Sequence, residues 1–88
     1  MAQIKEKELR LSGGIKVNFY RSTAVENSIY NQNEKTFAVK MRKTGDVYRY
    51  KGVAKRVAEE FINAPSQGKA LREILVDSFD FDKNPRVI

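Results

Sequence analysis

Apolar and polar residues alternate with a period of two over much of the first half of the chain. The alternation is clearest over 15–20 and 37–41, and it is less regular over 5–11. A period of two is typical of a β-strand with one buried face. The turn Ser12-Gly13-Gly14 separates the first two runs, so the sequence predicts an antiparallel hairpin there. A short strand is predicted over 28–30, before a polar turn.

A second hairpin is predicted over 37–51, with Gly45 in its turn. Its register decides which side chains share a face, because a shift of one residue turns every side chain over. With a two-residue loop ending at Gly45, Tyr48 lies opposite Met41 and the tyrosines of the second arm join the core face. With a three-residue loop and a bulge at the glycine, Tyr48 lies opposite Lys40 and the tyrosines share a surface with cations. The sequence is compatible with both registers.

After Gly52 the spacing of the apolar residues changes to three or four, which is the period of a buried helical stripe. Pro65 interrupts this stripe, and the hydroxyl of Ser66 is a candidate N-cap for a second helix. The apolar residues of the two stripes are Val53, Val57, Phe61 and Ala64, then Leu71, Ile74 and Leu75. The sequence therefore predicts an α+β fold, a small antiparallel sheet of hairpins covered by two C-terminal helices.

The length of 88 residues fits one domain, which we place at 1–79, with a C-terminal tail over 80–88. The composition, 41% hydrophobic and 32% charged, is that of a soluble globular protein. The first residues contain no apolar run of the length that a signal peptide or a membrane span needs, so we expect a cytoplasmic protein.

The residue types absent from the chain narrow its chemistry. There is no cysteine and no histidine, which excludes disulfides, thiolate metal sites and the commonest general base. Glu59 and Glu60 are adjacent on a predicted helix and diverge, so they do not form a pair of catalytic carboxylates. We expect no metal, no cofactor and no enzymatic activity.

The positive charge is concentrated in the middle of the chain. Residues 31–57 contain eight Lys or Arg residues and two acids, a net charge of +6, which equals the net charge of the whole chain. Residues 1–30 carry +2 and residues 58–88 carry −2. Clustered cations in a small basic domain are the electrostatic pattern of a protein that binds phosphate groups, although a solvated surface can have a similar pattern.

An ordered series of short motifs resembles the KTSC domain, a bacterial and phage module found alone or at the C-terminus of some lysyl-tRNA synthetases. The motifs are Ser22-Thr23, Ser28-Ile29-Tyr30, Tyr48-Arg49-Tyr50, Val53, Val57, Phe61, Ala64, Ser66 and Gly68. The resemblance covers about residues 21–75. The chain departs from the family at Ala54, where proline is common, and at Ala70-Leu71-Arg72, where the family has two aromatic residues and Asn. For function, the resemblance implies RNA binding only as a suggestion.

We predict a non-enzymatic module that binds RNA or single-stranded nucleic acid through a basic hairpin face. Cations would follow the phosphates while bases stack on rings, although in a domain this small the tyrosines also serve as core residues. The candidate residues are Lys40, Arg42, Lys43, Tyr48, Arg49, Tyr50, Lys51 and Lys55.

Two alternatives follow from other features. The first is a protein-interaction module, for example a small phage or bacterial accessory protein that binds an acidic host protein or self-associates through a hairpin edge. The second is a site for a nucleotide or small anion at the start of the second helix, where Ser66, Gly68 and Lys69 resemble a phosphate-binding helix start.

Overall fold

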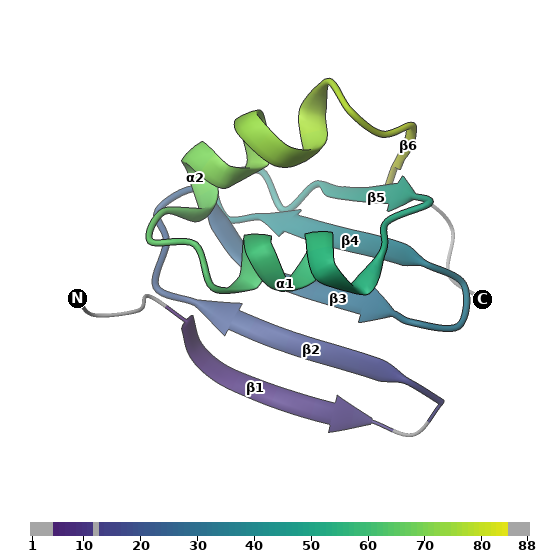
Figure 1. Cartoon of the computed structure of the whole chain (residues 1–88). Coiled ribbons are helices and arrows are strands. Elements are labelled where there is room, and N and C mark those ends of the chain that lie inside the picture. Colours follow the sequence, from purple (N-terminus) through teal and green to yellow (C-terminus); the bar gives the residue numbers. More distant parts are fainter. Residues whose placement is uncertain (1–4, 12, 85–88) are drawn as a thin grey trace.

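The structure, a computed structural model, describes residues 5–11 and 13–84, which form one antiparallel sheet and a layer of helices (Figure 1). The six strands pair in chain order, β1-β2-β3-β4-β5-β6, so each strand lies beside its neighbour in sequence. The elements are β1 (Lys5–Leu11), β2 (Ile15–Tyr20), β3 (Val25–Asn31), β4 (Thr36–Met41), β5 (Val47–Lys51), α1 (Lys55–Ile62), α2 (Gln67–Ala70), the π-helix η1 (Leu71–Val76) and β6 (Phe81–Lys83).

The predicted α+β class is confirmed, but the helices are not strictly C-terminal. They lie between β5 and β6, because the chain returns to the sheet after η1. The ring of Phe81 packs against Tyr48 and Tyr50, with both centroid distances at 5.5 Å. This aromatic contact and the pairing with β5 hold β6 at the edge of the sheet. Part of the stretch expected to be a tail is therefore a strand, while 85–88 lie outside the described residues.

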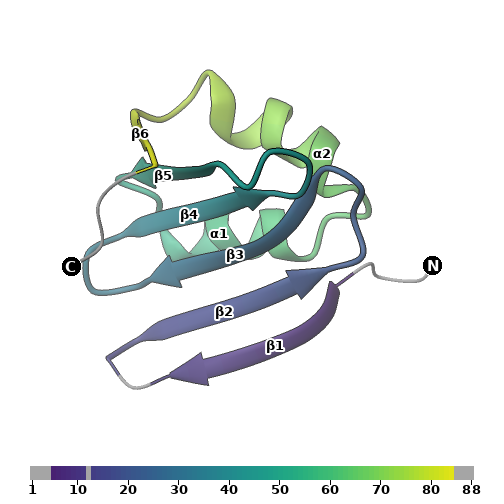
Figure 2. The same ribbon diagram turned by 180° about the vertical axis from the view of Figure 1, so that it is seen from behind.

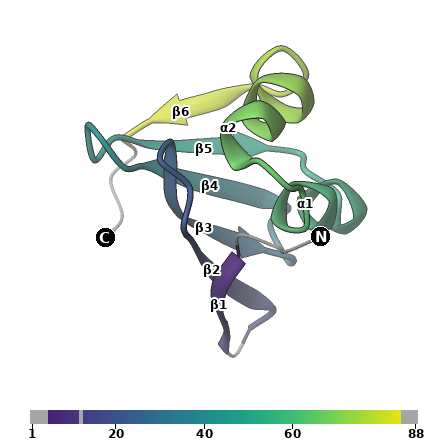
Figure 3. The ribbon, with the colours of Figure 1, turned by 90° about the vertical axis from the view of Figure 1, so that its left-hand side faces the viewer.

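All helices lie on one face of the sheet, the inner face, and the opposite, outer face has no described element over it (Figures 2 and 3). Alternate strand residues point inward and meet apolar side chains from the helices. The ring of Phe61 lies 5.1 Å from Phe37 and 6.0 Å from Tyr20, centroid to centroid. The buried core is Tyr20, Val25, Tyr30, Phe37, Val39, Tyr50, Val53, Ala58, Phe61, Ile62, Ala70 and Leu75.

Two tyrosines of the core, Tyr20 and Tyr30, have hydrogen-bond partners for their hydroxyl groups. The hydroxyl of Tyr30 donates to the carbonyl of Val53 at 2.7 Å, and the hydroxyls of Tyr20 and Ser28 lie 2.7 Å apart. Burial raises the pKa of Tyr20, Tyr30 and Tyr50 above the ordinary value. A buried ring with a satisfied hydroxyl is the structural use of tyrosine.

The β4–β5 hairpin has neither of the registers expected from the sequence. Val39 pairs with Tyr48 and Phe37 with Tyr50, because the connection is longer than two or three residues. The amide of Met41 donates to the carbonyl of Asp46, and Gly45 closes the turn with φ of 74°. The shift from the two-residue register is an even number of residues, so the tyrosines still lie on the core face.

The two predicted helical stripes are confirmed, and a short connection joins them. Phe61 is buried and Val57 is partly buried on α1, and Leu75 is buried on η1. The side-chain amide of Gln67, itself fully buried, donates to the carbonyls of Phe61 and Ala64 and so ties the end of α1 to α2.

In the described part of the chain, no helix has the length and apolar character needed to cross a membrane.

Candidate nucleic-acid interface

The outer face of the sheet carries three of the six cations predicted to bind nucleic acid, and none of the described elements covers it (Figure 2). Strand register places its side chains in rows that run across the sheet. One row contains Asn27, Lys40 and Val47 in β3, β4 and β5; the next contains Ile29, Ala38 and Arg49. We define the outer-face cations as Lys40, Arg49 and Lys51.

Each outer-face cation lies near a carboxylate. The amine of Lys40 is 3.6 Å from Glu26, while Arg49 and Lys51 lie 3.4 and 3.3 Å from the same oxygen of Asp82. All these side chains keep at least about a third of their surface exposed. Exposed pairs of this kind contribute about 0 to 1 kcal/mol, so an incoming phosphate can replace either carboxylate.

Arg42, another predicted contact residue, has a structural position. Its guanidinium donates to the backbone carbonyls of Ser22 and Tyr20, both at 2.8 Å. These bonds fasten the β4–β5 turn to the segment between β2 and β3. Lys43, next in the turn, is exposed and belongs to the helix-side groove described below.

The tyrosines of the Tyr48-Arg49-Tyr50 motif do not share the cationic surface. Tyr50 is 3% exposed, and Tyr48 lies on the same inner face between Val39 and Lys83. Their rings are therefore on the side of the sheet away from Arg49. Because successive side chains of a strand point to opposite faces, the two tyrosines of the motif lie on the inner face and Arg49 lies on the outer face.

The apolar groups that do share the outer face come from the earlier strands. Phe19 and Val17 alternate with the buried Asn18 and Tyr20, and they are only partly buried. Ile29 pairs with Val17 across β2 and β3 and is 42% exposed. These residues were not among the site candidates predicted from the sequence. The available signal was that the apolar residues of β2, Ile15, Val17 and Phe19, all lie on one face of the strand, opposite Lys16, Asn18 and Tyr20.

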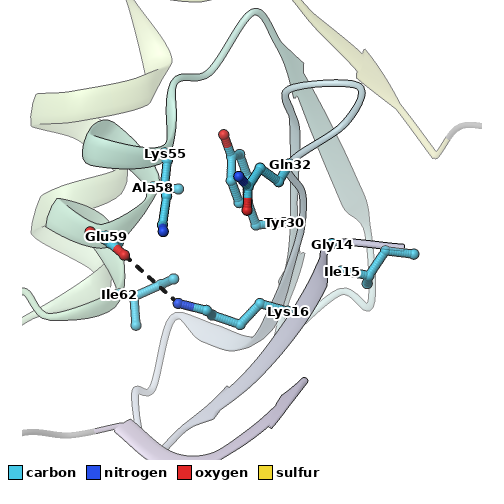
Figure 4. A pocket seen from close by; sticks show the side chains of 9 residues that line it. All are labelled: Gly14, Ile15, Lys16, Tyr30, Gln32, Lys55, Ala58, Glu59 and Ile62. Atoms are coloured by element: carbon cyan, nitrogen blue, oxygen red, sulfur yellow. Dashed lines mark ion pairs between the residues drawn. The ribbon is translucent and has the colours of Figure 1, made fainter. Parts of the chain in front are cut away.

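Lys55 lies on the helix side, in a pocket between α1 and the β2 and β3 strands (Figure 4). The pocket has a volume of about 260 Å³, and Lys16, Tyr30, Gln32 and Glu59 also line it. The amine of Lys16 is 3.9 Å from Glu59. Lys55 therefore does not extend the outer-face cations.

The start of the second helix is explained by capping and packing. The hydroxyl of Ser66 accepts a hydrogen bond from the amide of Lys69 at 3.4 Å, which confirms Ser66 as the N-cap. A Cβ atom at Gly68 would lie 3.1 Å from the Cβ of Ala24, so glycine permits a close approach there. Lys69 is exposed.

Among the described residues, no cluster of His, Cys, Asp or Glu is suited to hold a metal ion.

The sheet with helices on one face defines a small α+β domain, and comparison with known proteins assigns it to a family. The KTSC domain family matches residues 21–82, so the chain belongs to the KTSC domain family. The match extends beyond the predicted core into β6. A crystal structure of a KTSC domain protein from Yersinia pestis is similar in fold, with a TM-score of 0.67 and 21% identity over 88% of this chain and 94% of that chain. No curated protein matches the sequence.

Proposed function

We propose that this protein is a non-enzymatic module that binds RNA or single-stranded DNA on the outer face of its sheet. The observation that carries the proposal is a sheet face, uncovered by any described element, on which cations and apolar side chains lie in the same rows across the strands. Lys40, Arg49 and Lys51 supply positive charge, while Phe19 and Ile29 supply partly exposed apolar surface.

The arrangement suits a flexible single strand better than a duplex. A six-stranded sheet is too broad for the major groove of a duplex, which admits a helix or a two-stranded ribbon. Its face can instead support bases that are splayed out on it. Tyr48 and Tyr50, predicted from the sequence to stack on bases, lie on the inner face. We therefore expect a base to stack on Phe19, which lies on the outer face. The amides of Asn27 and Asn31 on β3 add hydrogen-bonding groups near the same rows.

The salt dependence of binding tests the role of the cations. Fluorescence anisotropy with a labelled oligo-dT or oligo-U strand gives the dependence of log affinity on log salt for the full chain. Replacing Lys40, Arg49 and Lys51 together by Gln should flatten that slope by about 2, or about 0.7 for each lost phosphate contact.

A matched variant controls for the loss of net charge. Arg56, Lys69 and Arg72 are exposed cations on the helices and have no ion pair within the described residues. Replacing these three by Gln removes the same charge from the other side of the molecule. If this control flattens the slope as much as the outer-face variant, the outer face is not the interface.

Protein binding is a second candidate, and one observation favours it. Ile29 lies near the middle of the outer face with 42% of its surface exposed, beside Val17, and exposed apolar patches mark interaction sites. Size-exclusion chromatography before and after nuclease treatment separates the two functions. Loss of an ultraviolet-absorbing species supports nucleic-acid binding, whereas a defined oligomer that persists without nucleic acid supports protein binding.

A further inference from the structure

A groove on the helix side of the molecule has the features of a small-molecule site. It lies between η1 and strands β5 and β6 and has a volume of about 420 Å³. This volume is within the range of about 300 to 1,000 Å³ that is usual for ligand pockets. We call it the η1 groove; its lining includes Met41, Lys43, Tyr48, Leu71, Val76 and Phe81.

The η1 groove exposes apolar surface that the fold leaves uncovered. Val76 is 42% exposed and Phe81 is 47% exposed, and within the described chain they are two of the three large apolar residues with such exposure. The ring of Phe81 is held by contacts with Tyr48 and Tyr50. The exposed ring is therefore part of an ordered wall, and exposed apolar surface in a concave site points to a ligand.

The π-helix forms the opposite wall of the groove. Leu71 and Val76 begin and end η1, and both line the groove. In an α-helix, residues five apart point about 140° away from each other, because each turn has 3.6 residues. In a π-helix the backbone bonds join residues five apart, which brings such residues toward the same side. The rare helix geometry thus places both side chains on the groove, and short π-helical segments are frequent at functional sites.

The rim of the groove favours a negative charge. Asp46 lies at the rim, but Lys83 is 3.7 Å from its carboxylate and the amide of Asn84 donates to it at 3.0 Å. The hydrogen bond from Asn84 is the main cause that lowers the pKa of Asp46. Lys43, also at the rim, is exposed and has no ion pair within residues 5–11 and 13–84. The turn that carries Lys43 is anchored by the two hydrogen bonds of Arg42.

We propose that the η1 groove binds a small amphiphilic anion. Its apolar body, one or two fused rings or a short acyl chain, packs between the η1 wall and the ring of Phe81. Its carboxylate or phosphate lies beside Lys43. The site is separate from the outer face, because the groove opens on the helix side of the sheet, and the proposal does not rest on nucleic-acid binding.

The probes for this proposal are 2-naphthoate and its neutral analogue 2-naphthamide, titrated into the isotope-labelled full chain and followed by amide chemical shifts. We expect 2-naphthoate to shift the amides of Tyr48, Val76 and Phe81 and to bind about fivefold more tightly than the amide, since one exposed charge pair contributes at most about that factor. Shifts confined to the outer face or to the Lys16 pocket, or no saturable shift, would overturn the proposal.

Three variants separate the apolar and charged parts of the site. Lys43→Gln should reduce the affinity for 2-naphthoate to that for 2-naphthamide. The affinity for 2-naphthamide should not change. Val76→Glu should abolish binding of both probes, and the exposure of Val76 makes the variant compatible with folding. Arg56→Gln, a cation on α1 outside the groove, is the control and should change neither affinity. Equal loss with Arg56→Gln would show that net charge alone attracts the probe.

Discussion

The two faces of the sheet use similar side chains for different purposes. On the inner face, aromatic rings meet the helices, and the exposed fraction of Phe37, Phe61 and Tyr20 is 1% or less. On the outer face, Phe19 and Ile29 keep part of their surface in contact with solvent and lie near exposed ion pairs. Because the inner face buries the rings that pack against the helices, the side chains of the outer face can vary with little loss of stability.

The largest expected effect comes from breaking the inner face. Phe37→Ala should lower the free energy of unfolding by about 3 to 5 kcal/mol, because it leaves a cavity between Tyr30 and Phe61. Urea denaturation followed by circular dichroism measures this loss. Ile29→Thr on the outer face is the comparison and should stay within about 0.5 kcal/mol of the wild type. Similar losses for both would remove the distinction between the faces.

Substitutions of Arg42 test whether this predicted nucleic-acid contact instead stabilises the fold. Arg42→Ala should lower the free energy of unfolding by about 1 to 2 kcal/mol, since two charge-assisted hydrogen bonds to backbone carbonyls are lost. Arg42→Lys should recover little of it, because an ammonium lacks the planar fork of donors. Urea denaturation gives both values. If stability is unchanged and oligonucleotide affinity falls instead, Arg42 belongs to the interface.

The buried tyrosines predict a loss of stability at alkaline pH. A tyrosine in the unfolded chain loses its proton near pH 10, whereas burial keeps Tyr20 protonated in the folded state to higher pH. The folded state then holds more protons than the unfolded state, so the free energy of unfolding falls as the pH rises above about 10. The slope for one such group is at most about 1.4 kcal/mol per pH unit.

Tyr20→Phe isolates this contribution from the titration of lysines. At pH 8 the variant should be about 1 kcal/mol less stable than the wild type, because Ser28 loses its 2.7 Å partner. This deficit should shrink at pH 11, since only the wild type has Tyr20 to titrate. A deficit that is constant between denaturation curves at pH 8 and pH 11 would contradict the assignment.

The smallest expected change in stability accompanies a gain in binding. Asp82→Asn removes the carboxylate shared by Arg49 and Lys51, and its cost should be within about 1 kcal/mol because the pairs are exposed. Oligonucleotide affinity should rise about two- to fivefold, as two cations become available. Asp77→Asn, an exposed acid after η1, is the charge-matched control. An equal gain in the control would show a general charge effect.

The alternation of side chains predicted strands and the apolar spacing predicted the helices, although the buried face of β2 carries Asn18 and Tyr20 rather than the apolar Val17 and Phe19. Both follow from fixed periods of backbone geometry. The register of the β4–β5 hairpin could not be predicted, because it depends on a turn whose closing bond joins Met41 to Asp46. The three residues of β6 also carry no periodic signal; their position depends on the contact of Phe81 with two tyrosines far back in the chain.

The candidate site was predictable only in part for the same reason. Arg49 and Lys51 fall on the outer face by alternation, but the partners of Arg42 are backbone carbonyls about 20 residues earlier. Asp82 reaches Arg49 only because β6 pairs with β5. Long-range contacts of this kind depend on the tertiary fold and leave no local pattern in the sequence.

The proposal that the outer face of the sheet binds nucleic acid can be tested by mapping the contact surface on the protein. Amide chemical shifts of the isotope-labelled protein are followed while a single-stranded oligo-U is added at low salt. We expect the largest shifts to map to β2 through β5, including Ile29, Lys40 and Arg49. Shifts that map only to the helices, or no shifts at a salt concentration that preserves electrostatic binding, would contradict it.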